Sequence, residues 1–303
     1  MNVLVVGSVA FDTVRTPFGT GQEVLGGSAS YFSLAASFFA EVRLVAAVGE
    51  DFRDEHLDAL RGRTIDLRGL RKLPGRTFRW EGEYGFDLNT ARTLRTELGV
   101  FAGFRPVLPE EFRDSEVVFL ANIDPEIQLE VLQQVRAPRL VACDTMNFWI
   151  SGKRDALLRT LAKVDALLIN DGEARELTGE PNLVRAAKAI RAMGPRTVII
   201  KRGEYGALMF REGSVFSAPA YPLESVLDPT GAGDSFAGGF AGYLSKTGEF
   251  SDDAMRRAVI TGSVMASLNV EDFSLRRLAR ATHDEIAGRY REFQRLTAFE
   301  TLV

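Results

Sequence analysis

The stretch DPTGAGDSFAGGF, residues 228–240, decides the class of this chain. Glycines flank Ala232, the carboxyl group of Asp234 follows, and an apolar run at helical spacing comes next, so we expect a helix to begin near Gly233. The first amides of a helix have no partner within it, and together with the helix dipole they attract anions. Glycines let a phosphate approach such amides closely. The backbone of Gly231, Ala232 and Gly233 is therefore a candidate anion hole.

Asp234 has two interpretations. A carboxylate beside an anion hole can take the proton of a hydroxyl group that attacks phosphorus. An acidic residue at a helix start can also be a simple N-cap. An N-cap alone requires neither glycine at both 231 and 233 nor the Gly238–Gly239 pair one turn later. These surroundings favour a catalytic base.

Short apolar segments alternate with segments of helical periodicity along most of the chain. This alternation is typical of βαβ units with a parallel sheet. The expected strands are residues 2–7, 43–49, 116–122, 139–144, 165–170 and 196–203. The expected helices include residues 28–40, 124–135, 181–194 and 282–293. We therefore predict one α/β domain over residues 1–303, with a mainly parallel twisted sheet flanked by helices.

One segment, residues 64–103, breaks this rhythm because it alternates polar and apolar side chains around scattered glycines. Within it, Thr77–Trp80 and Glu83–Phe86 are expected to be edge strands of a small antiparallel sheet. Together with residues 12–25, the segment is predicted to form a β lid inserted in the α/β core.

Composition excludes several classes of protein. The net charge is −4 and the pI about 5.5, which argues against a nucleic-acid partner. Cys143 is the single cysteine, so no internal disulfide is possible, and it is expected to pack in a strand. His56 and His283 are too isolated for a metal site. No apolar run approaches the ~18 residues of a membrane span, and no signal peptide is evident, so we predict a cytoplasmic protein without a membrane partner.

The stretch 228–240 closely resembles the C-terminal signature of the ribokinase-like, or PfkB-type, carbohydrate and nucleoside kinases. Other motifs extend this resemblance over essentially the whole chain. They are GSVAFD (7–12), LGGSAS (25–30), VGED (48–51), NDGEARELTG (170–179) and KRGEYGA (201–207). The resemblance implies a ribokinase-like fold and an enzyme that transfers the γ-phosphoryl group of ATP to a hydroxyl of a small sugar or, alternatively, of a nucleoside.

The resemblance also implies roles for single residues. Asp234 would be the catalytic base, with residues 231–233 as the anion hole. The residues expected to bind substrate are Asp12, Gly26, Gly27, Ser28 and Asn147. Those expected near ATP are Asn170, Lys201, Gly203 and Asn269. The expected metal sites are Asn170 and Glu173 for Mg²⁺ through water, and Asp228 and Thr230 for a monovalent cation such as K⁺.

Several of these residues have plainer readings from the sequence alone. Asn170 and Glu173 fit a helix cap, Lys201 fits a solvated strand end, and Asp12 fits a turn. Asn269 could simply wall the adenine pocket.

The acceptor is left open by the sequence. Ribokinases carry asparagine, lysine and asparagine where this chain has Ala10, Ser28 and Tyr31, which makes free ribose doubtful. Gly-Gly-Ser at residues 26–28 resembles adenosine kinases and related nucleoside kinases, whereas CDTMNFW (143–149) resembles the strand end of fructokinases and ketodeoxygluconate kinases. A set of aromatic residues could stack on a base or on a sugar. It comprises Tyr31, Phe78, Trp80, Phe148 and Trp149.

The predicted lid raises the question of oligomeric state. Trp80 and Tyr84 are expected to serve sheet packing or a dimer contact rather than to close over the substrate, and Arg79 is expected to be a solvated edge-strand charge. Lids of the resembled family often pair between subunits, which makes a homodimer through the lid an open alternative.

The sequence argues against two other functional classes. An NAD-dependent oxidoreductase needs G-x-G-x-x-G after the first strand, and VVGSVAFD (5–12) has one glycine there. A non-catalytic sugar- or nucleotide-binding relative is expected to lack Asp234 or the glycines beside it, and this chain has them.

Overall fold

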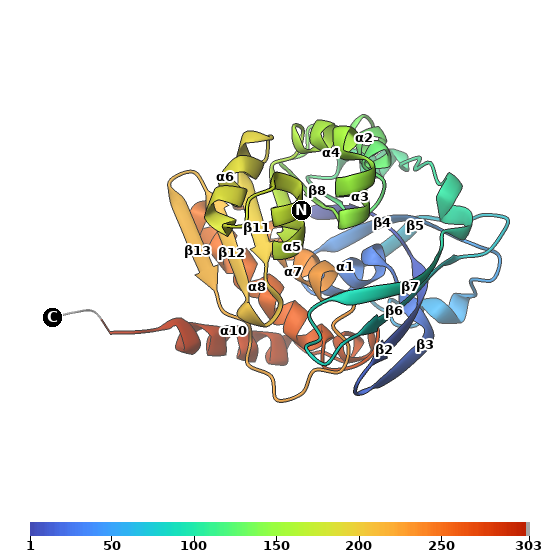
Figure 1. Cartoon of the computed structure of the whole chain (residues 1–303). Coiled ribbons are helices and arrows are strands. Elements are labelled where there is room, and N and C mark those ends of the chain that lie inside the picture. Colours follow the sequence, from blue (N-terminus) through green and yellow to red (C-terminus); the bar gives the residue numbers. More distant parts are fainter. Residues whose placement is uncertain (301–303) are drawn as a thin grey trace.

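Nine strands form the large sheet of the structure, a computed structural model that describes residues 1–300 (Figure 1). The sheet is parallel from β5 to β11, and β12 and β13 are added antiparallel at the other edge. In spatial order the strands are β13 (Ser214–Ala218), β12 (Ala207–Arg211), β11 (Thr197–Lys201), β10 (Ala166–Asn170), β9 (Leu140–Asp144), β8 (Val117–Leu120), β1 (Asn2–Val6), β4 (Glu41–Val48) and β5 (Ile65–Lys72).

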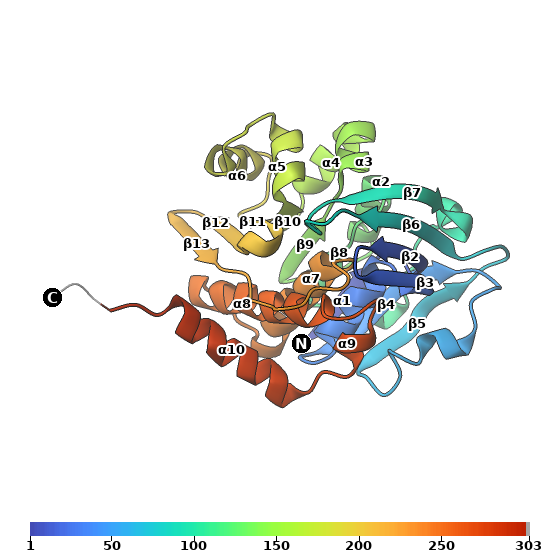
Figure 2. The ribbon, with the colours of Figure 1, turned by 60° about the horizontal axis from the view of Figure 1, so that its bottom comes forward.

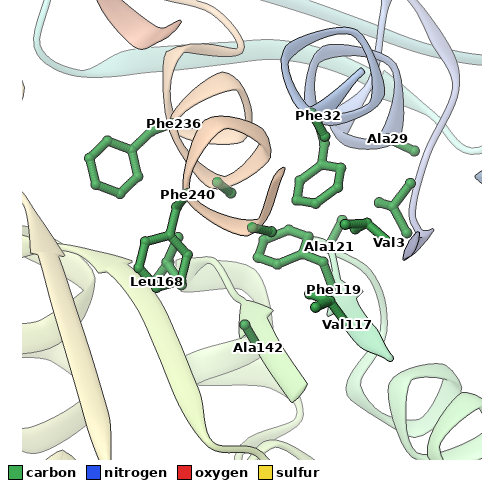
Figure 3. Close-up of a cluster of buried hydrophobic side chains, with 14 of the residues drawn as sticks. Val3, Ala29, Phe32, Val117, Phe119, Ala121, Ala142, Leu168, Phe236 and Phe240 are labelled. Atoms are coloured by element: carbon green, nitrogen blue, oxygen red, sulfur yellow. The ribbon is translucent and has the colours of Figure 1, made fainter. Parts of the chain in front are cut away.

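One face of this sheet is covered by a layer of helices from both ends of the chain (Figure 2). Phe32 stacks on Phe119 of β8 with ring centroids 4.5 Å apart, and Phe236 and Phe240 extend the same core (Figure 3). The helices that pack on the sheet are α1 (Ser28–Ala36), α7 (Ala232–Thr247) and α8 (Asp252–Asn269), and α9 (Arg276–Ala279) and α10 (His283–Thr297) pack on the outer side of α1 and α8.

The opposite face carries a second helical layer (Figure 2). Buried side chains such as Val131, Leu157 and Leu177 pack there against the strands. The helices are α2 (Pro125–Leu132), α3 (Asn147–Gly152), α4 (Arg154–Leu161), α5 (Asp171–Thr178) and α6 (Leu183–Ala192).

Short 3₁₀ turns lie at Asp54–Leu57, Gly99–Gly103, Glu110–Asp114 and Gly203–Tyr205.

A second sheet of four strands stands apart from the large one (Figure 2). Its order is β3 (Gly19–Gly26), β2 (Ala10–Thr16), β6 (Phe78–Tyr84) and β7 (Ala91–Glu97). The β2–β3 and β6–β7 pairs are antiparallel hairpins, and the two hairpins join through a parallel β2–β6 pair. We call these four strands the small sheet.

The predicted strands and helices of the core are confirmed, with small shifts at their ends. The cap signals hold: Asp124 accepts the amide of Glu126 at the start of α2, and Thr282 forms a capping box with Glu285 at the start of α10. Helix α7, which carries Asp234, begins at Ala232, one residue earlier than expected. Gly231 is its N-cap and adopts a left-handed conformation with φ of 74°.

The predicted lid needs correction in three respects. Residues 65–72 do not belong to it, because they form β5 and pair in parallel with β4 in the large sheet. Thr77–Trp80 and Glu83–Phe86 are not separate edge strands, since Phe78–Tyr84 is one strand in the interior of the small sheet. The small sheet is not wholly antiparallel either, because β2 pairs with β6 in parallel.

Arg79 is consequently not a solvated edge charge. It is largely buried and pairs with Asp51 at 2.8 Å and Glu23 at 3.1 Å.

Within residues 1–300, no helix combines the length and the apolar character that crossing a lipid bilayer requires.

Candidate active site

Three chemically active side chains end neighbouring parallel strands. Asp144 ends β9, Asn170 ends β10 and Lys201 ends β11. The carboxyl ends of parallel strands share one edge of a sheet, which is where ligands bind in open α/β folds. The N-terminus of α7 meets this edge, because a Cβ atom on Gly233 would lie 2.8 Å from the ammonium nitrogen of Lys201. The predicted anion hole and these strand ends therefore form one site.

The loop before α7 is held in place by Asp228 within it and by Asn269 at the end of α8. Asp228 Oδ1 accepts the amide of Thr230 at 2.9 Å, and Asn269 Nδ2 donates to the Thr230 carbonyl at 2.8 Å. Gly231 then turns with positive φ against the ring of Tyr31, and a Cβ atom there would collide with that ring. Only glycine satisfies both the conformation and the space at this position.

The amides of the predicted anion hole differ in availability. Ala232 donates its amide to the Pro229 carbonyl at 3.2 Å. Within residues 1–300, the amides of Gly231 and Gly233 have no acceptor. These two amides, rather than all three, are the free donors at the start of the helix.

Asp234 follows in the first turn of α7 and is only partly exposed. Burial and the negative charge of Asp144 raise the pKa of Asp234 to about 7, and the positive charge of Lys201 opposes them. A general base works best when its pKa lies near the working pH. Asp234 therefore has the electrostatic environment of a base rather than that of an exposed cap.

Asp12 lies on β2 of the small sheet and is 5% exposed. Its pKa is raised to about 7 by burial, with the charges of Asp228 and Asp234 adding to the effect and a hydrogen bond from Gly27 reducing it. A Cβ atom on Gly26 would lie 1.9 Å from Asp12 Oδ2, so any larger residue there would displace this carboxylate. Asp12 and Gly26, two of the residues expected to bind substrate, are thus in direct contact.

Two predicted substrate residues have other contacts. The Ser28 hydroxyl accepts the amide of Ser8 at 3.2 Å and lies 3.1 Å from the Ser8 hydroxyl. Asn147 is exposed at the start of α3, and its side chain makes no hydrogen bond within residues 1–300. Neither side chain is brought against Asp12 or Asp234 by a hydrogen bond.

Asn170 and Glu173 form a helix cap, which is the simpler of the two interpretations that the sequence allows. Asn170 Oδ1 accepts the Glu173 amide at 2.7 Å, and Glu173 Oε2 accepts the Asn170 amide at 3.0 Å. The same glutamate also belongs to the charged cluster: burial and then the charge of Asp144 raise the pKa of Glu173 to about 7, while Lys201 lowers it. One carboxylate oxygen remains without a hydrogen bond in the described chain.

Sequence reasoning missed Asp144 as a site residue. Its Oδ2 accepts a hydrogen bond from Lys201 Nζ at 3.1 Å, and both side chains are mostly buried. Lys201 is therefore not the solvated strand-end lysine of the plainer reading. The available signal was that Asp144 ends a predicted strand, as Asn170 and Lys201 do.

The small sheet contacts both sides of the site. The Thr230 hydroxyl donates to the Tyr84 hydroxyl at 3.3 Å, next to Gly231. Asn89, between β6 and β7, reaches the turn at Gly203, where a Cβ atom would lie 2.5 Å from its Oδ1. Tyr84 thus contacts the candidate site, in addition to the sheet packing or dimer contact that was expected of it.

The other aromatic residues serve packing in most cases. Trp80 donates its indole N–H to Thr93 at 3.2 Å and covers Gly82, which confirms the sheet-packing reading for this residue. Phe78 stacks on Phe101, whereas Phe148 is exposed. Among the remaining candidates, His56 packs on Phe11 and His283 on Phe38, and Cys143 is buried with its pKa raised by burial.

Comparison with known proteins agrees with this geometry. The model of the pfkB family of carbohydrate kinases matches residues 2–277. The chain belongs to this family. Its activity class is therefore that of an ATP-dependent phosphotransferase acting on a sugar or nucleoside hydroxyl, as the sequence predicted. Within residues 1–300, no three His, Cys, Asp or Glu side chains gather as a metal site.

A relative and two solved structures illustrate what this pfkB kinase resembles. A cytidine kinase from Thermococcus kodakarensis is 34% identical over 249 residues, covering 80% of this chain and 88% of that protein. A Burkholderia thailandensis nucleoside kinase bound to inosine superposes with a TM-score of 0.73 at 20% identity, over 96% of this chain and 98% of that one. An Arabidopsis thaliana ribokinase bound to ribose and ATP gives 0.76 at 21% identity, over 95% and 98%. These structures confirm the ribokinase-like fold.

Proposed function

We propose that this pfkB kinase phosphorylates a nucleoside, with Asp234 as the base. The acceptor oxygen bonds to the γ-phosphorus of ATP while the bond from that phosphorus to the bridging oxygen of ADP breaks, and the hydroxyl proton passes to Asp234. The position of this carboxylate directly after the free amides of Gly231 and Gly233 is the observation that carries the proposal. Such amides stabilise the charge on the transferring phosphoryl group.

The nucleoside, rather than a free sugar, is supported by two observations. The cytidine kinase from T. kodakarensis matches most of this chain at 34% identity. Ser28 stands where ribokinases carry a lysine, and its hydroxyl is engaged with Ser8, so this position offers a free sugar no charged contact. A sugar acceptor is the second candidate, because the matching family is described as carbohydrate kinases.

Asp12 is the residue that would hold acceptor hydroxyl groups. It lies on β2 of the small sheet and is buried against the loop at Gly27. An acceptor reaches so enclosed a carboxylate only if the small sheet moves, so we infer that this sheet acts as a lid that opens and closes over the acceptor.

The residues near ATP fit Mg²⁺. Glu173 has a buried carboxylate with one oxygen free of hydrogen bonds, and Asn170 stands beside it. Because Mg²⁺ retains several waters, these residues would hold it through water together with the phosphates of ATP. Bound Mg²⁺ would neutralise phosphate charge. Lys201 and Gly203 would lie along the phosphates.

A monovalent cation such as K⁺ fits the loop at Asp228. This carboxylate is fully buried, and within residues 1–300 it accepts amides from Thr230 and Ser274 but has no ion-pair partner. The buried Oδ1 of Asn269 has no donor in the described chain either. Uncompensated buried acceptors of this kind are stabilised by a bound cation.

We also propose that two copies of the chain form a homodimer through the small sheet. Charged side chains cover the face of the small sheet that lines a cavity of about 470 Å³. Opposite charges are already paired there, as in Arg15 with Glu81 at 2.5 Å. Light scattering after gel filtration measures whether the chain is a dimer, and a monomer at assay concentration would rule this arrangement out.

An assay with a panel of candidate acceptors tests the proposed function. Purified enzyme is assayed with ATP and Mg²⁺ against pyrimidine and purine nucleosides, ribose, deoxyribose and hexoses, with ADP release and the phosphorylated product both measured. We expect at least one nucleoside to be phosphorylated with higher kcat/KM than any free sugar. Turnover confined to free sugars would assign the second candidate, and binding without turnover would show a non-catalytic relative.

A further inference from the structure

The ion pair between Lys201 and Asp144 spans the end of a strand. In the register of the sheet, Asp144 is level with Leu168 of β10 and Lys201 is level with Asn170 of the same strand. Lys201 therefore bends across the end of β10 to reach a carboxylate two strands away, at 3.1 Å. The side chains are 18% and 7% exposed.

This reach places the ammonium group at the N-terminus of α7. The ammonium nitrogen occupies the side of Gly233 where a Cβ atom would stand, at 2.8 Å. Lysine has three N–H donors, and one is used on Asp144. Within residues 1–300, the other two have no acceptor. The ammonium group thus lies next to Gly233, whose amide has no acceptor in the same residues.

Asp144 is itself fixed from several sides. Its Oδ1 accepts the amide of Thr145 at 2.8 Å, and its backbone carbonyl accepts Gln128 Nε2 at 3.1 Å. Both carboxylate oxygens are thus engaged, Oδ1 by the Thr145 amide and Oδ2 by Lys201.

Fold stability alone does not account for this pair. A buried ion pair often contributes little net stability, because both charges lose their hydration. Burial acts to lower the pKa of Lys201, but neighbouring carboxylates outweigh it and the pKa is raised, so the lysine stays charged. These carboxylates are Asp144, Glu173 and Asp234.

We propose that Asp144 is a positioning residue for phosphoryl transfer. Its carboxylate holds the Lys201 ammonium group against Gly233, where the two remaining N–H donors meet the transferring phosphoryl group. This inference rests on the proposed kinase function. Asp144 touches neither acceptor nor phosphate and acts through Lys201.

A double-mutant cycle on kcat tests the inference. Lys201→Met is expected to lower kcat by ~10²-fold or more, the scale for loss of one preorganised charge contact. Asp144→Asn is expected to lower kcat by at least ~10-fold, and the double variant is expected to be no slower than Lys201→Met, because residues that act as a unit are not additive. The acceptor KM should stay unchanged in Asp144→Asn, since Asp144 does not contact the acceptor.

Two further measurements separate positioning from general structure. Removing the charge of Asp144, which raises the pKa of Asp234, should move the acid limb of the kcat/KM profile to lower pH. The matched control is Asp252→Asn, which breaks the Arg211–Asp252 pair at the start of α8 and should leave kcat and the pH profile unchanged.

The inference is overturned if Asp144→Asn keeps wild-type kcat or if the two single effects multiply in the double variant. Should Asp144→Asn fail to fold, Asp144→Glu keeps the charge but moves the carboxylate, and wild-type kcat in that variant overturns the inference equally. A wild-type protein without any kinase activity would instead refute the proposed function, and the inference with it.

Discussion

The Tyr84 hydroxyl accepts a hydrogen bond from the Thr230 hydroxyl at 3.3 Å, although the two residues are 146 positions apart. Tyr84 ends β6 of the small sheet, and Thr230 directly precedes Gly231 of the proposed anion hole. The contact therefore links the proposed lid to the loop that we propose binds phosphate.

Tyr84→Phe removes this link and keeps the ring. One lost hydrogen bond corresponds to ~1 kcal/mol, so we expect kcat/KM for the acceptor to fall by about 5-fold while ATP affinity changes little. Steady-state kinetics with each substrate varied in turn measures both. Equal kcat/KM in variant and wild type would show that the contact plays no part in closure.

Glycine at position 26 is predicted to be essential for the acceptor. Gly26→Ala places a Cβ atom against the Asp12 carboxylate and should abolish acceptor phosphorylation while calorimetry still detects ATP binding. The matched control is Gly288→Ala in α10, where no atom lies within 4 Å of the new Cβ. That control should be fully active and more stable by ~1 kcal/mol from helix propensity. An active Gly26→Ala enzyme would contradict the packing described here.

The Asp12 carboxylate should destabilise the ligand-free fold at high pH. Its pKa is raised from 3.8 to about 7 in the folded state, so the folded protein binds more protons than the unfolded chain between these values, and stability falls as pH rises through them. Asp12→Asn removes this pH-dependent loss of stability. The gain in Tm over wild type should be larger at pH 8 than at pH 5. A gain that is the same at both pH values would mean that the pKa of Asp12 is not raised.

Tyr31 offers a separate test of stability. Its hydroxyl is buried and has no hydrogen-bond partner within residues 1–300. An unsatisfied buried polar group costs ~1–3 kcal/mol, so Tyr31→Phe should increase the free energy of unfolding of the ligand-free protein by about 1 kcal/mol on this scale. Denaturant titration measures the change, and a loss of stability would show that the hydroxyl has a partner after all.

The local chemistry of the chain could be predicted from its sequence, but contacts between distant segments could not. The glycines around Asp234 and the cap at Asn170 are local signals, and each appears where it was expected. By contrast, Lys201 and Asp144 are 57 positions apart, and nothing in either segment specifies the other. Their meeting depends on the strand order of the sheet.

The wrong prediction that placed β5 in the lid has a similar cause. Ile65–Lys72 is an edge strand in which every residue except Gly69 is partly or fully exposed. Its alternating pattern is the same as that of a strand in a small half-solvated sheet. The strand belongs to the large sheet because it pairs with β4. That pairing includes a register shift between Arg43 and Val45.

The central claim is that Asp234 removes the acceptor proton. The most direct measurement is single-turnover phosphorylation of the preferred acceptor by Asp234→Asn, in parallel with ATP binding to the same variant. The account predicts unchanged ATP affinity and a rate at least ~10²-fold lower, the usual scale for a general base. A rate equal to that of the wild type would contradict it.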